Sequence, residues 1–440
     1  GNYTAMIGDI NAKLIAGNFG LMRGNTWSQG RGGLGGFLVN ENGTVGNITA
    51  DYIINNYVTL NDDYSMSHGF MSGGAIYNNG NPGAYYTEVY DNDPGYLCEG
   101  CWHEYKAEWH KREKQYVSVI GDIKAQIMGN SAFGRNARGG FLHNEWAQVG
   151  SIDGDMLGNF VQYFAYSEDD DGDEEDEQNR PTHLGGAIYN ENGKIGTILS
   201  KNIKDNFANG PIAMGGAIYN ASFVEIQSDE YYNDGDMTYF YSQNTAYDDI
   251  GMKIDGSTFD GNYVHSTEGN AYGGAIVNEL SIRQLLTNDE RNRYGDFEEK
   301  TLEEKIADVK ASKAARAMTL TNTNFISNHA DSDSGRAFGG AIYSTGDLNI
   351  IANNGKTSLF SGNTANGENN AIYMQKSSLD TMDWRQEMGN IDENETFYSN
   401  LNLSAVSNGV IQFDDEIDGD GYNINISGDG TGVVKFNNLV

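Results

Sequence analysis

Short apolar segments recur along the chain at fixed distances from pairs of glycines. The hexamer Gly-Gly-Ala-Ile-Tyr-Asn occurs three times, and four variants keep the paired glycines followed by an apolar run. The seven copies span residues 73–78, 185–190, 215–220, 273–278, 339–344, 35–40 and 139–144. A degenerate copy, Ala371-Ile372-Tyr373, has no glycines. Chance does not produce seven such hexamers, so the chain is built from repeats.

Two further elements belong to each repeat. Nine residues after the second glycine comes Val/Ile-Gly-x-Ile, as at Val45, Val149 and Ile195. Further on comes an asparagine, and in the second half of the chain it becomes Phe-x-x-Asn, at Phe259/Asn262, Phe325/Asn328, Phe360/Asn363 and Phe397/Asn400. Three short strands per coil, separated by turns, predict an all-β fold, a right-handed parallel β-helix of roughly 10 to 13 coils.

Each position of the hexamer has a physical role in such a coil. Paired glycines permit positive φ and a tight turn. Isoleucine is expected to point into the lumen and stack on the next coil, which leaves the alanine and tyrosine beside it facing outward. Asparagine can stack its amide on the asparagine of the next coil. The predicted structural positions are Gly73, Gly74, Ile76, Asn78, Gly185, Gly186, Ile188, Asn190, Gly215, Gly216, Ile218, Asn220, Gly273, Gly274, Ile276, Asn278, Gly339, Gly340 and Ile342.

Four segments interrupt the period of a helix that otherwise spans residues 1–440 as one domain. They are an insertion with a cysteine pair at 79–117, an acidic loop at 162–183, a Tyr/Asp-rich insertion at 227–249 and a segment of helical spacing at 279–318. The last is predicted to form one or two amphipathic helices on the side of the rod. Repeat folds usually place such insertions as loops on one face.

Composition narrows the class of partner. The chain has 57 glycines but only 4 prolines, and its formal net charge is −34. A high glycine content with so little proline argues against a disordered low-complexity chain. The negative charge disfavours nucleic acid and anionic membrane surfaces as partners. No apolar run is long enough for a transmembrane helix, and the first residues do not form a signal peptide.

The cysteine pair is the most chemically suggestive motif. Cys98 and Cys101 have the spacing of a zinc knuckle or a redox pair, and His103 or His110 could complete a metal site. A local disulfide is the favoured interpretation, with zinc or free thiols as alternatives. Because Trp102 follows the second cysteine, a haem attachment is rejected. No cofactor is expected.

Acidic residues offer weaker candidates. The run 168–177 lacks the spaced ligands of a calcium loop and is expected to be a solvated loop. Residues 414–421 are expected to be turns. Asp153 and Asp155 could form a glycosidase pair by spacing alone, but 62 acids make such coincidences common. With no Ser-His-Asp set, P-loop or dinucleotide motif in view, we expect the chain not to be an enzyme.

Tyrosines recur at one place in the coil. Tyr77, Tyr189, Tyr219 and Tyr343 are expected to form an aromatic ladder along one outer face. Such a ladder could bind sugars or proteins. The favoured alternative is that the rings only stack on one another and stabilise the sheet.

The hexamers alternating with Phe-x-x-Asn resemble the passenger repeats of type V autotransporters, especially the polymorphic outer-membrane proteins of chlamydiae and related Gram-negative adhesins. The tail 424–438 is similar to coils of large autotransporter adhesins. The resemblance implies export, display at or release from the bacterial surface, and adhesion to host, matrix, glycan or neighbouring-cell ligands. It implies membrane contact only through a translocator barrel, which does not follow in this sequence. The alternatives kept open are a polysaccharide-degrading β-helix enzyme and a subunit that self-assembles end to end into filaments.

Overall fold

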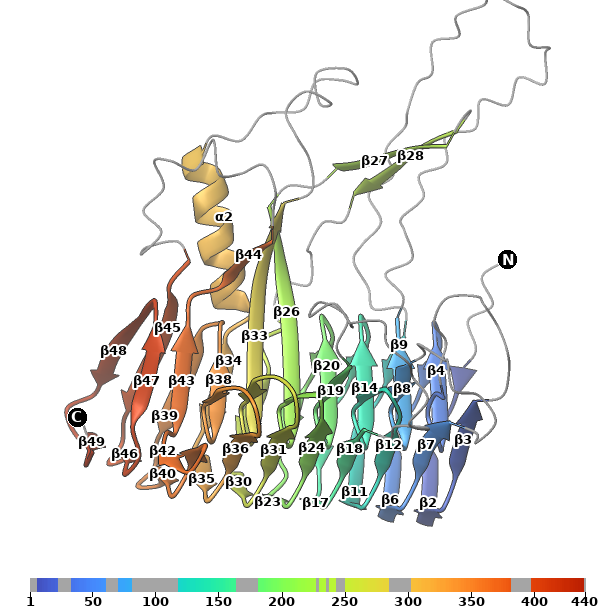
Figure 1. The fold of residues 1–440 in the computed structure, drawn as a ribbon, viewed down its shortest axis with the longest axis horizontal. Coiled ribbons are helices and arrows are strands. Elements are labelled where there is room, and N and C mark those ends of the chain that lie inside the picture. The colour runs from blue at the N-terminus through green and yellow to red at the C-terminus, as the bar shows by residue number, and fades with distance from the viewer. Residues whose placement is uncertain are drawn as a thin grey trace, which may run out of the picture.

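The chain forms a parallel β-helix, seen from the side in Figure 1, so the predicted fold class is confirmed. The structure is a computed structural model. It describes residues 6–22, 33–60, 70–80, 118–163, 181–226, 229–234, 237–242, 250–284, 302–380 and 397–438. Within these ranges no helix is long and apolar enough to cross a membrane.

Five parallel sheets, named A to E in the order that a coil visits them, run along the rod. Sheet A holds β1 (Met6–Ile7), β5 (Thr44–Val45), β10 (Val119–Ile120), β15 (Gln148–Val149) and β21 (Lys194–Ile195). Sheet B holds one or two strands of every coil: β2 (Ile10–Ala16), β6 (Ile48–Ile54), β11 (Ile123–Met128), β16 (Ile152–Asp153), β17 (Met156–Leu157), β22 (Thr197–Ile198), β23 (Asn202–Lys204), β29 (Lys253–Asp255), β30 (Thr258–Asp260), β34 (Met318–Thr321), β35 (Asn324–Ile326), β39 (Leu348–Ala352), β40 (Thr357–Ser361), β45 (Ser399–Ala405), β46 (Val410–Phe413), β48 (Tyr422–Gly428) and β49 (Val433–Phe436).

The remaining sheets complete the coil. Sheet C holds β3 (Phe19–Met22), β7 (Tyr57–Leu60), β12 (Ser131–Phe133), β18 (Phe160–Gln162), β24 (Phe207–Gly210), β31 (Tyr263–Ser266), β36 (His329–Ser332), β41 (Thr364–Ala365) and the antiparallel β42 (Glu368–Asn369). Sheet D holds β8 (Phe70–Ser72), β13 (Asn136–Arg138), β19 (Thr182–Leu184), β25 (Ile212–Met214), β32 (Ala271–Tyr272) and β37 (Ala337–Phe338). Sheet E holds β4 (Leu38–Glu41), β9 (Ile76–Asn79), β14 (Leu142–Glu145), β20 (Ile188–Glu191), β26 (Ile218–Ile226), β33 (Ile276–Gln284), β38 (Ile342–Ser344), β43 (Ile372–Gln375), β44 (Ser378–Asp380) and β47 (Ile417–Asp420). The expectation of three strands per coil was too low.

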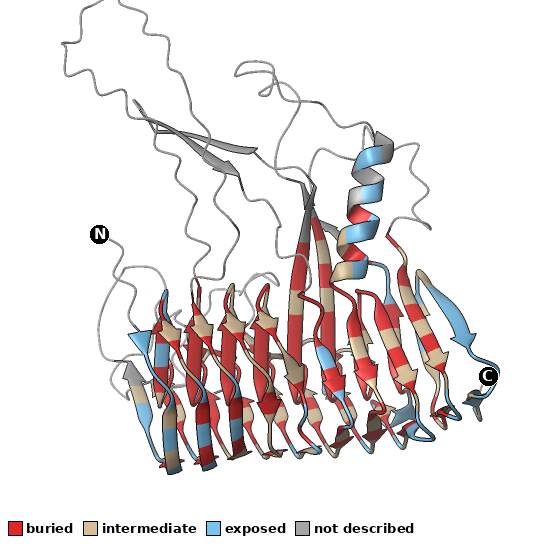
Figure 2. Ribbon diagram, turned by 180° about the vertical axis from the view of Figure 1, so that it is seen from behind, coloured by how far each residue is buried: buried red, intermediate tan, exposed pale blue. Residues whose placement is uncertain are grey.

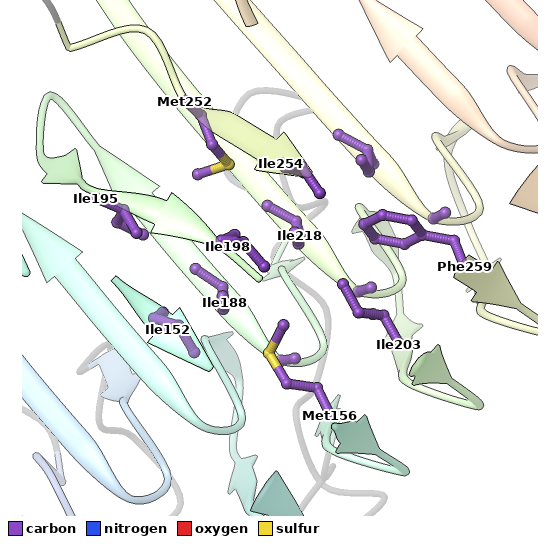
Figure 3. Packing of buried hydrophobic residues seen from close by; sticks show 14 of the residues in the cluster. Ile152, Met156, Ile188, Ile195, Ile198, Ile203, Ile218, Met252, Ile254 and Phe259 are labelled. Carbon is purple, nitrogen blue, oxygen red and sulfur yellow. The ribbon is translucent and has the colours of Figure 1, made fainter. Parts of the chain in front are cut away.

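The main core is a set of aliphatic stacks inside sheets A, B and E. Ile188 and Ile218 of sheet E pair in register and face Ile198 and Ile254 of sheet B across the lumen (Figure 3). Buried residues follow one another from coil to coil, whereas the last strands, β48 and β49, are largely exposed (Figure 2). Stacking identical aliphatic residues at the strand spacing replaces the single core of a globular domain.

Sheets C and D enclose a second, thinner core, which we call the wing. It is filled with small side chains such as Ala132, Ala137, Ala208 and Ala213, together with Val58 and Met71. His183 of β19 is also fully buried, and its ring lies where a side chain at Gly210 would stand. The hexamer pattern does not reveal this wing, because its strands are short and carry few large apolar residues.

An asparagine ladder, which we call the inner asparagine ladder, runs through the interior. The amide of each member donates to the side-chain oxygen of the next coil at 2.8–3.0 Å, and the ladder ends at a carboxylate. Its members are Asn18, Asn56, Asn130, Asn159, Asn206, Asn262, Asn328, Asn363 and Asp415. A second ladder joins Asn40, Asn78, Asn144, Asn190, Asn220, Asn278 and Ser344. Amide stacking between coils is therefore confirmed, and the nine members of the first ladder plus the β48–β49 coil give ten described coils.

The two glycines of each pair meet different constraints. The first, such as Gly185 with φ +67°, lies in the left-handed region. The second, such as Gly186, has ordinary φ, but a Cβ there would collide with the carbonyl oxygen of Gly216 in the next coil. Positive φ thus explains only the first glycine, and close approach of two backbones explains the second.

The outward placement is wrong for the alanines, whereas Tyr77, Tyr189 and Tyr219 lie outside the main core but are buried. Ala75, Ala187 and Ala217 are fully buried in the main core, because the strand begins only at the following isoleucine. Tyr189 points out of the lumen but is buried against sheet D. Sheet D side chains such as Leu184 and Tyr272 pack against this row, so an outward side chain of sheet E is still covered.

The Phe-x-x-Asn pattern is right for three copies and wrong for the fourth. Phe259, Phe325 and Phe360 stack inside the coil at 4.8–4.9 Å between ring centroids. The next ring in that stack is Phe413, not Phe397, and the next ladder member is Asp415. Asn400 instead donates its amide to Asp347.

The degenerate copy at Ala371 has a structural reason. After β41 the chain turns at Asn366 and Gly367 and returns antiparallel as β42, so this coil has no strand in sheet D. Without that strand there is no glycine corner to form. The side chain of Asn370 accepts the hydrogen bond from the Gly339 amide, and the wing ends here.

Candidate binding face

Judged from the described strands on either side of them, the inserted segments begin at two places in the coil. After sheet E the regular path is interrupted at 81–117, 227–249, 285–301 and 381–396, and after sheet C at 23–32, 61–69 and 164–180. The larger set therefore lies along one edge, at the end of sheet E. In Figure 1 the described parts of these insertions, α2 (Leu302–Ala315) and the hairpin of β27 (Asp229–Asp234) and β28 (Met237–Ser242), lie on one side of the rod.

The uninterrupted coils show what each insertion replaces. Two residues join sheet E to sheet A in three coils, at 42–43, 146–147 and 192–193. In the first insertion the same two places are taken by Gly80 and Ser118, as the register of β10 with β15 and β21 shows. The insertion, predicted at 79–117, thus begins after Gly80 and enters a two-residue turn without changing the coil on either side.

The middle of the rod carries a lateral extension. β26 and β33 continue past the coil and stay paired over nine residues, so 279–284 is strand and not part of a helical insertion. β44 pairs with the far end of β33. Phe223, Leu280 and Ile282 are buried in this extension, and Trp146, two coils before Phe223, contacts the Phe223 ring edge-on at 5.0 Å.

The helix α2 packs beside β26 with a mixed face. Among the described side chains, Val309 and Lys313 of the helix are buried, as is Arg316 just after its end. The Lys313 ammonium donates to the Tyr398 carbonyl at 2.8 Å, and burial lowers its pKa. A single helix is described in this insertion, and its described side chains bury both an apolar residue, Val309, and a charged one, Lys313.

The predicted tyrosines belong to one row on the outer side of sheet E, which we call the tyrosine row. In register, its members are Tyr77, His143, Tyr189, Tyr219, Val277, Tyr343 and Tyr373. The first four rings stack at 4.7–5.4 Å between centroids. Tyr77, Tyr189 and Tyr219 are at most 8% exposed, so the expectation of an exposed ladder is wrong for them, and only Tyr343 is half-buried.

Polar side chains beside this row engage its hydroxyl and imidazole groups. Tyr189 donates to Glu191, and Tyr219 donates to Glu279 at 2.5 Å. His143 contacts the Glu145 carboxylate at 3.0 Å. Glu145, Glu191 and Glu279 share one register position, which Asn79 and Ala221 occupy in two other coils, and Glu279 lies in the coil after that of Tyr219. A buried phenol needs such a partner, so the row of acids is explained by the row of rings.

One cation balances this cluster. The guanidinium of Arg138 lies over the Phe70 ring at 4.0 Å and over the Tyr189 ring at 5.0 Å. Burial lowers the pKa of His143, so its neutral form is favoured. Burial opposes the charged form of Glu145, but the His143 hydrogen bond and the charge of Arg138 outweigh it and lower its pKa. Each of the three carboxylates, Glu145, Glu191 and Glu279, is thus engaged by a side chain of the tyrosine row.

Sequence reasoning missed a second aromatic set, the sheet C strip. Phe160, Phe207, Tyr263 and His329 stack at 4.7–5.2 Å on the outer face of sheet C, all half-buried. Each directly follows a member of the inner asparagine ladder, which is the sequence signal that could have revealed it. Because the rings stack face to face, the faces between neighbouring rings are covered.

The other predicted candidates are dispersed. Cys98, Cys101 and the acidic run 168–177 lie outside the described residues. Asp155 accepts two hydrogen bonds from Asn202, and Asp153 pairs with Lys124 at 3.6 Å. Residues 417–420 form β47 rather than turns. No group of three His, Cys, Asp or Glu side chains that could hold a metal ion occurs in the part of the chain that the structure describes.

No family model, no curated protein and no solved structure matches the chain. The likeness to autotransporter passengers therefore stays a prediction that rests on the repeats alone.

Proposed function

We propose that this chain is an extracellular rod, displayed on or released from a Gram-negative bacterial surface, that acts as an adhesin or structural rod. It binds host, matrix or neighbouring-cell ligands through segments inserted along the sheet E edge. The observation that carries the proposal is the restriction of the inserted segments to two turns of an otherwise regular coil. Loops placed on a rigid repeat scaffold are a common location for binding sites.

The rigidity of the scaffold supports the same proposal. Two asparagine ladders and a continuous aliphatic core join successive coils. Such a rod holds its edge at a fixed distance from its ends. A binding role is favoured over polysaccharide cleavage because Glu145, Glu191 and Glu279 are hydrogen-bonded by their own neighbours.

Two deletions test the proposal, and each restores a turn that neighbouring coils already use. Removing 81–117 joins Gly80 to Ser118, in the place of 192–193. Removing 164–180 joins Tyr163 to Pro181, in the place of 210–211. The first deletion trims the sheet E edge and the second trims the sheet C turn, so they form a matched pair.

Adhesion of the purified chain to epithelial cells and to immobilised matrix proteins is the measurement. We expect the 81–117 deletion to reduce binding and the 164–180 deletion to leave it unchanged. Equal binding by all three proteins would remove the sheet E edge as the site. No binding by the intact chain to cells or matrix would overturn the adhesin role itself.

A further inference from the structure

The last ring of the tyrosine row, Tyr373, has different neighbours from the earlier rings. Tyr343 and Tyr373 stack at 6.1 Å between centroids, and the register position after Tyr373 is Asp418 of β47, which carries no ring. Sheet D has already ended at Phe338, whose ring meets Tyr373 edge-on at 4.7 Å. The row therefore stops at a step where the wing ends, and Tyr373 has a ring neighbour in its row on one side only.

The hydroxyl of Tyr373 also differs from the hydroxyls of the other tyrosines in the row. Tyr77, Tyr189, Tyr219 and Tyr343 each have a hydrogen-bond partner; that of Tyr343 is Gln375, at 2.7 Å. Among the residues that the structure describes, none hydrogen-bonds to the Tyr373 hydroxyl. Tyr373 is half-buried, so part of this residue is reachable from solvent.

Three charged side chains surround this ring end. Asp418 and Asp420 are exposed on β47, in register with Tyr373 and Gln375. The Arg336 guanidinium, also exposed, lies over the Phe338 ring at 4.7 Å. Burial raises the pKa of Tyr373, and Asp418, Arg336 and Asp420 act on it as well, which places all three charges within electrostatic reach of the hydroxyl.

We propose that Tyr373, Gln375, Asp418, Asp420 and Arg336 form a binding site for a neutral sugar residue of a glycan. The inference rests on the proposed function and names its ligand class. The apolar C–H face of a pyranose packs on an aromatic ring face. Adjacent hydroxyls donate to carboxylates and accept from a guanidinium or an amide, and such charge-assisted bonds are the stronger ones.

The side chains of the site disfavour two other ligand classes, an anionic sugar and a quaternary ammonium. Two carboxylates against one guanidinium disfavour an anionic sugar. A quaternary ammonium would suit the ring and the carboxylates, but it has no use for Arg336 and Gln375 as hydrogen-bond donors. The sheet C strip is a poorer sugar site, because its rings cover one another's faces.

Saturation-transfer NMR and titration calorimetry on the full chain test the site. The probes are glucose, galactose, mannose, N-acetylglucosamine, their β-linked disaccharides and choline. We expect at least one neutral sugar to bind, Tyr373→Ala to weaken it by about tenfold or more, and Asp420→Asn to weaken it by a few-fold. Tyr373→Phe keeps the ring and should retain most of the affinity. Tyr263→Ala, which removes a half-buried ring of the sheet C strip, is the control and should change nothing.

Three results would overturn the inference: no sugar bound, sugar bound equally by Tyr373→Ala, or choline bound alone. Its failure is separable from that of the proposed function. If cells are bound and Tyr373→Ala has no effect on sugar or cells, the adhesin proposal stands without this site. If the sugar is bound at Tyr373 but cells and matrix are not, the site stands and the adhesin proposal fails.

Discussion

Single residues at the sheet D–sheet E corner are fixed by backbone geometry more than by side-chain chemistry. Gly185 adopts φ +67°, a conformation that costs other residues about 1–2 kcal/mol. Gly186 has an ordinary φ but lies against the backbones of Phe207 and Gly216. No side chain fits there without moving one coil away from the next.

The first prediction compares Gly186→Ala with Gly355→Ala. Gly355 has φ +70° and open space where a Cβ would stand, so alanine there meets only the left-handed penalty of about 1–2 kcal/mol. Gly186→Ala should lower the free energy of unfolding by about 3 kcal/mol or more, because backbone must move. Urea unfolding followed by circular dichroism measures both. Equal losses of unfolding free energy in the two variants would show that neighbouring coils can move apart at the glycine corner at little cost.

The second prediction concerns His183, whose pKa burial lowers from 6.5 to about 4. The folded state disfavours the protonated ring, so its contribution to stability is complete above pH 6.5 and is lost as the pH falls towards 4. That loss amounts to about 3 kcal/mol. His183→Gln, which retains a donor for the Gly134 carbonyl, should therefore show a shallower fall in stability than the wild type between pH 7.5 and 4.5. Parallel curves for the two proteins would contradict it, since other groups contribute equally to both.

At the scale of elements, the inner asparagine ladder has a direction. Each member receives hydrogen bonds from the coil before it and donates to the coil after it, as Asn206 does between Asn159 and Asn262. The last acceptor, Asp415, takes bonds from the Gly362 amide and from both nitrogens of Asn363. A carboxylate suits this place because it accepts without donating.

The third prediction is that Asp415→Asn lowers the free energy of unfolding by about 1–3 kcal/mol, since an amide brings donors to a place already filled with donors. Hydrogen exchange at the Gly362 and Asn363 amides should become faster. Asp255→Asn, on an exposed strand position, is the control and should stay within about 0.5 kcal/mol. If Asp415→Asn is as neutral as the control, the ladder does not need an acceptor-only end.

The elements that could be predicted from sequence were those with a large repeated side chain. Ile188 and Ile218 mark their strands because every coil needs an aliphatic residue at that place. The wing strands escaped prediction because alanine and glycine fill their thin core. Phe397/Asn400 shows the opposite error, in which the spacing recurs without the structural position.

For the whole molecule, the fourth prediction is that deleting 81–117 leaves the β-helix intact. The free energy of unfolding should be unchanged or higher by up to about 2 kcal/mol, because a long loop closure becomes a two-residue turn. Thermal and urea unfolding of the deletion variant measure this. A clear loss of stability would show instead that the insertion is part of the folded rod.

The candidate site could be only half predicted from sequence. The recurrence of tyrosine after isoleucine correctly indicated a row of rings at one place in the coil. Its burial could not be predicted, since it depends on sheet D side chains that pack against the row. The free end at Tyr373 follows from the early termination of sheet D, a topological event with no repeat pattern of its own.

The confinement of insertions to two turns has an evolutionary consequence. A lineage can lengthen, exchange or discard the segment between Gly80 and Ser118 by recombination, because the coils on both sides already match a two-residue junction. Selection on what the segment contacts then proceeds without compensating changes elsewhere in the chain. We expect natural variants to differ most in length at these two junctions and least at the glycine corners.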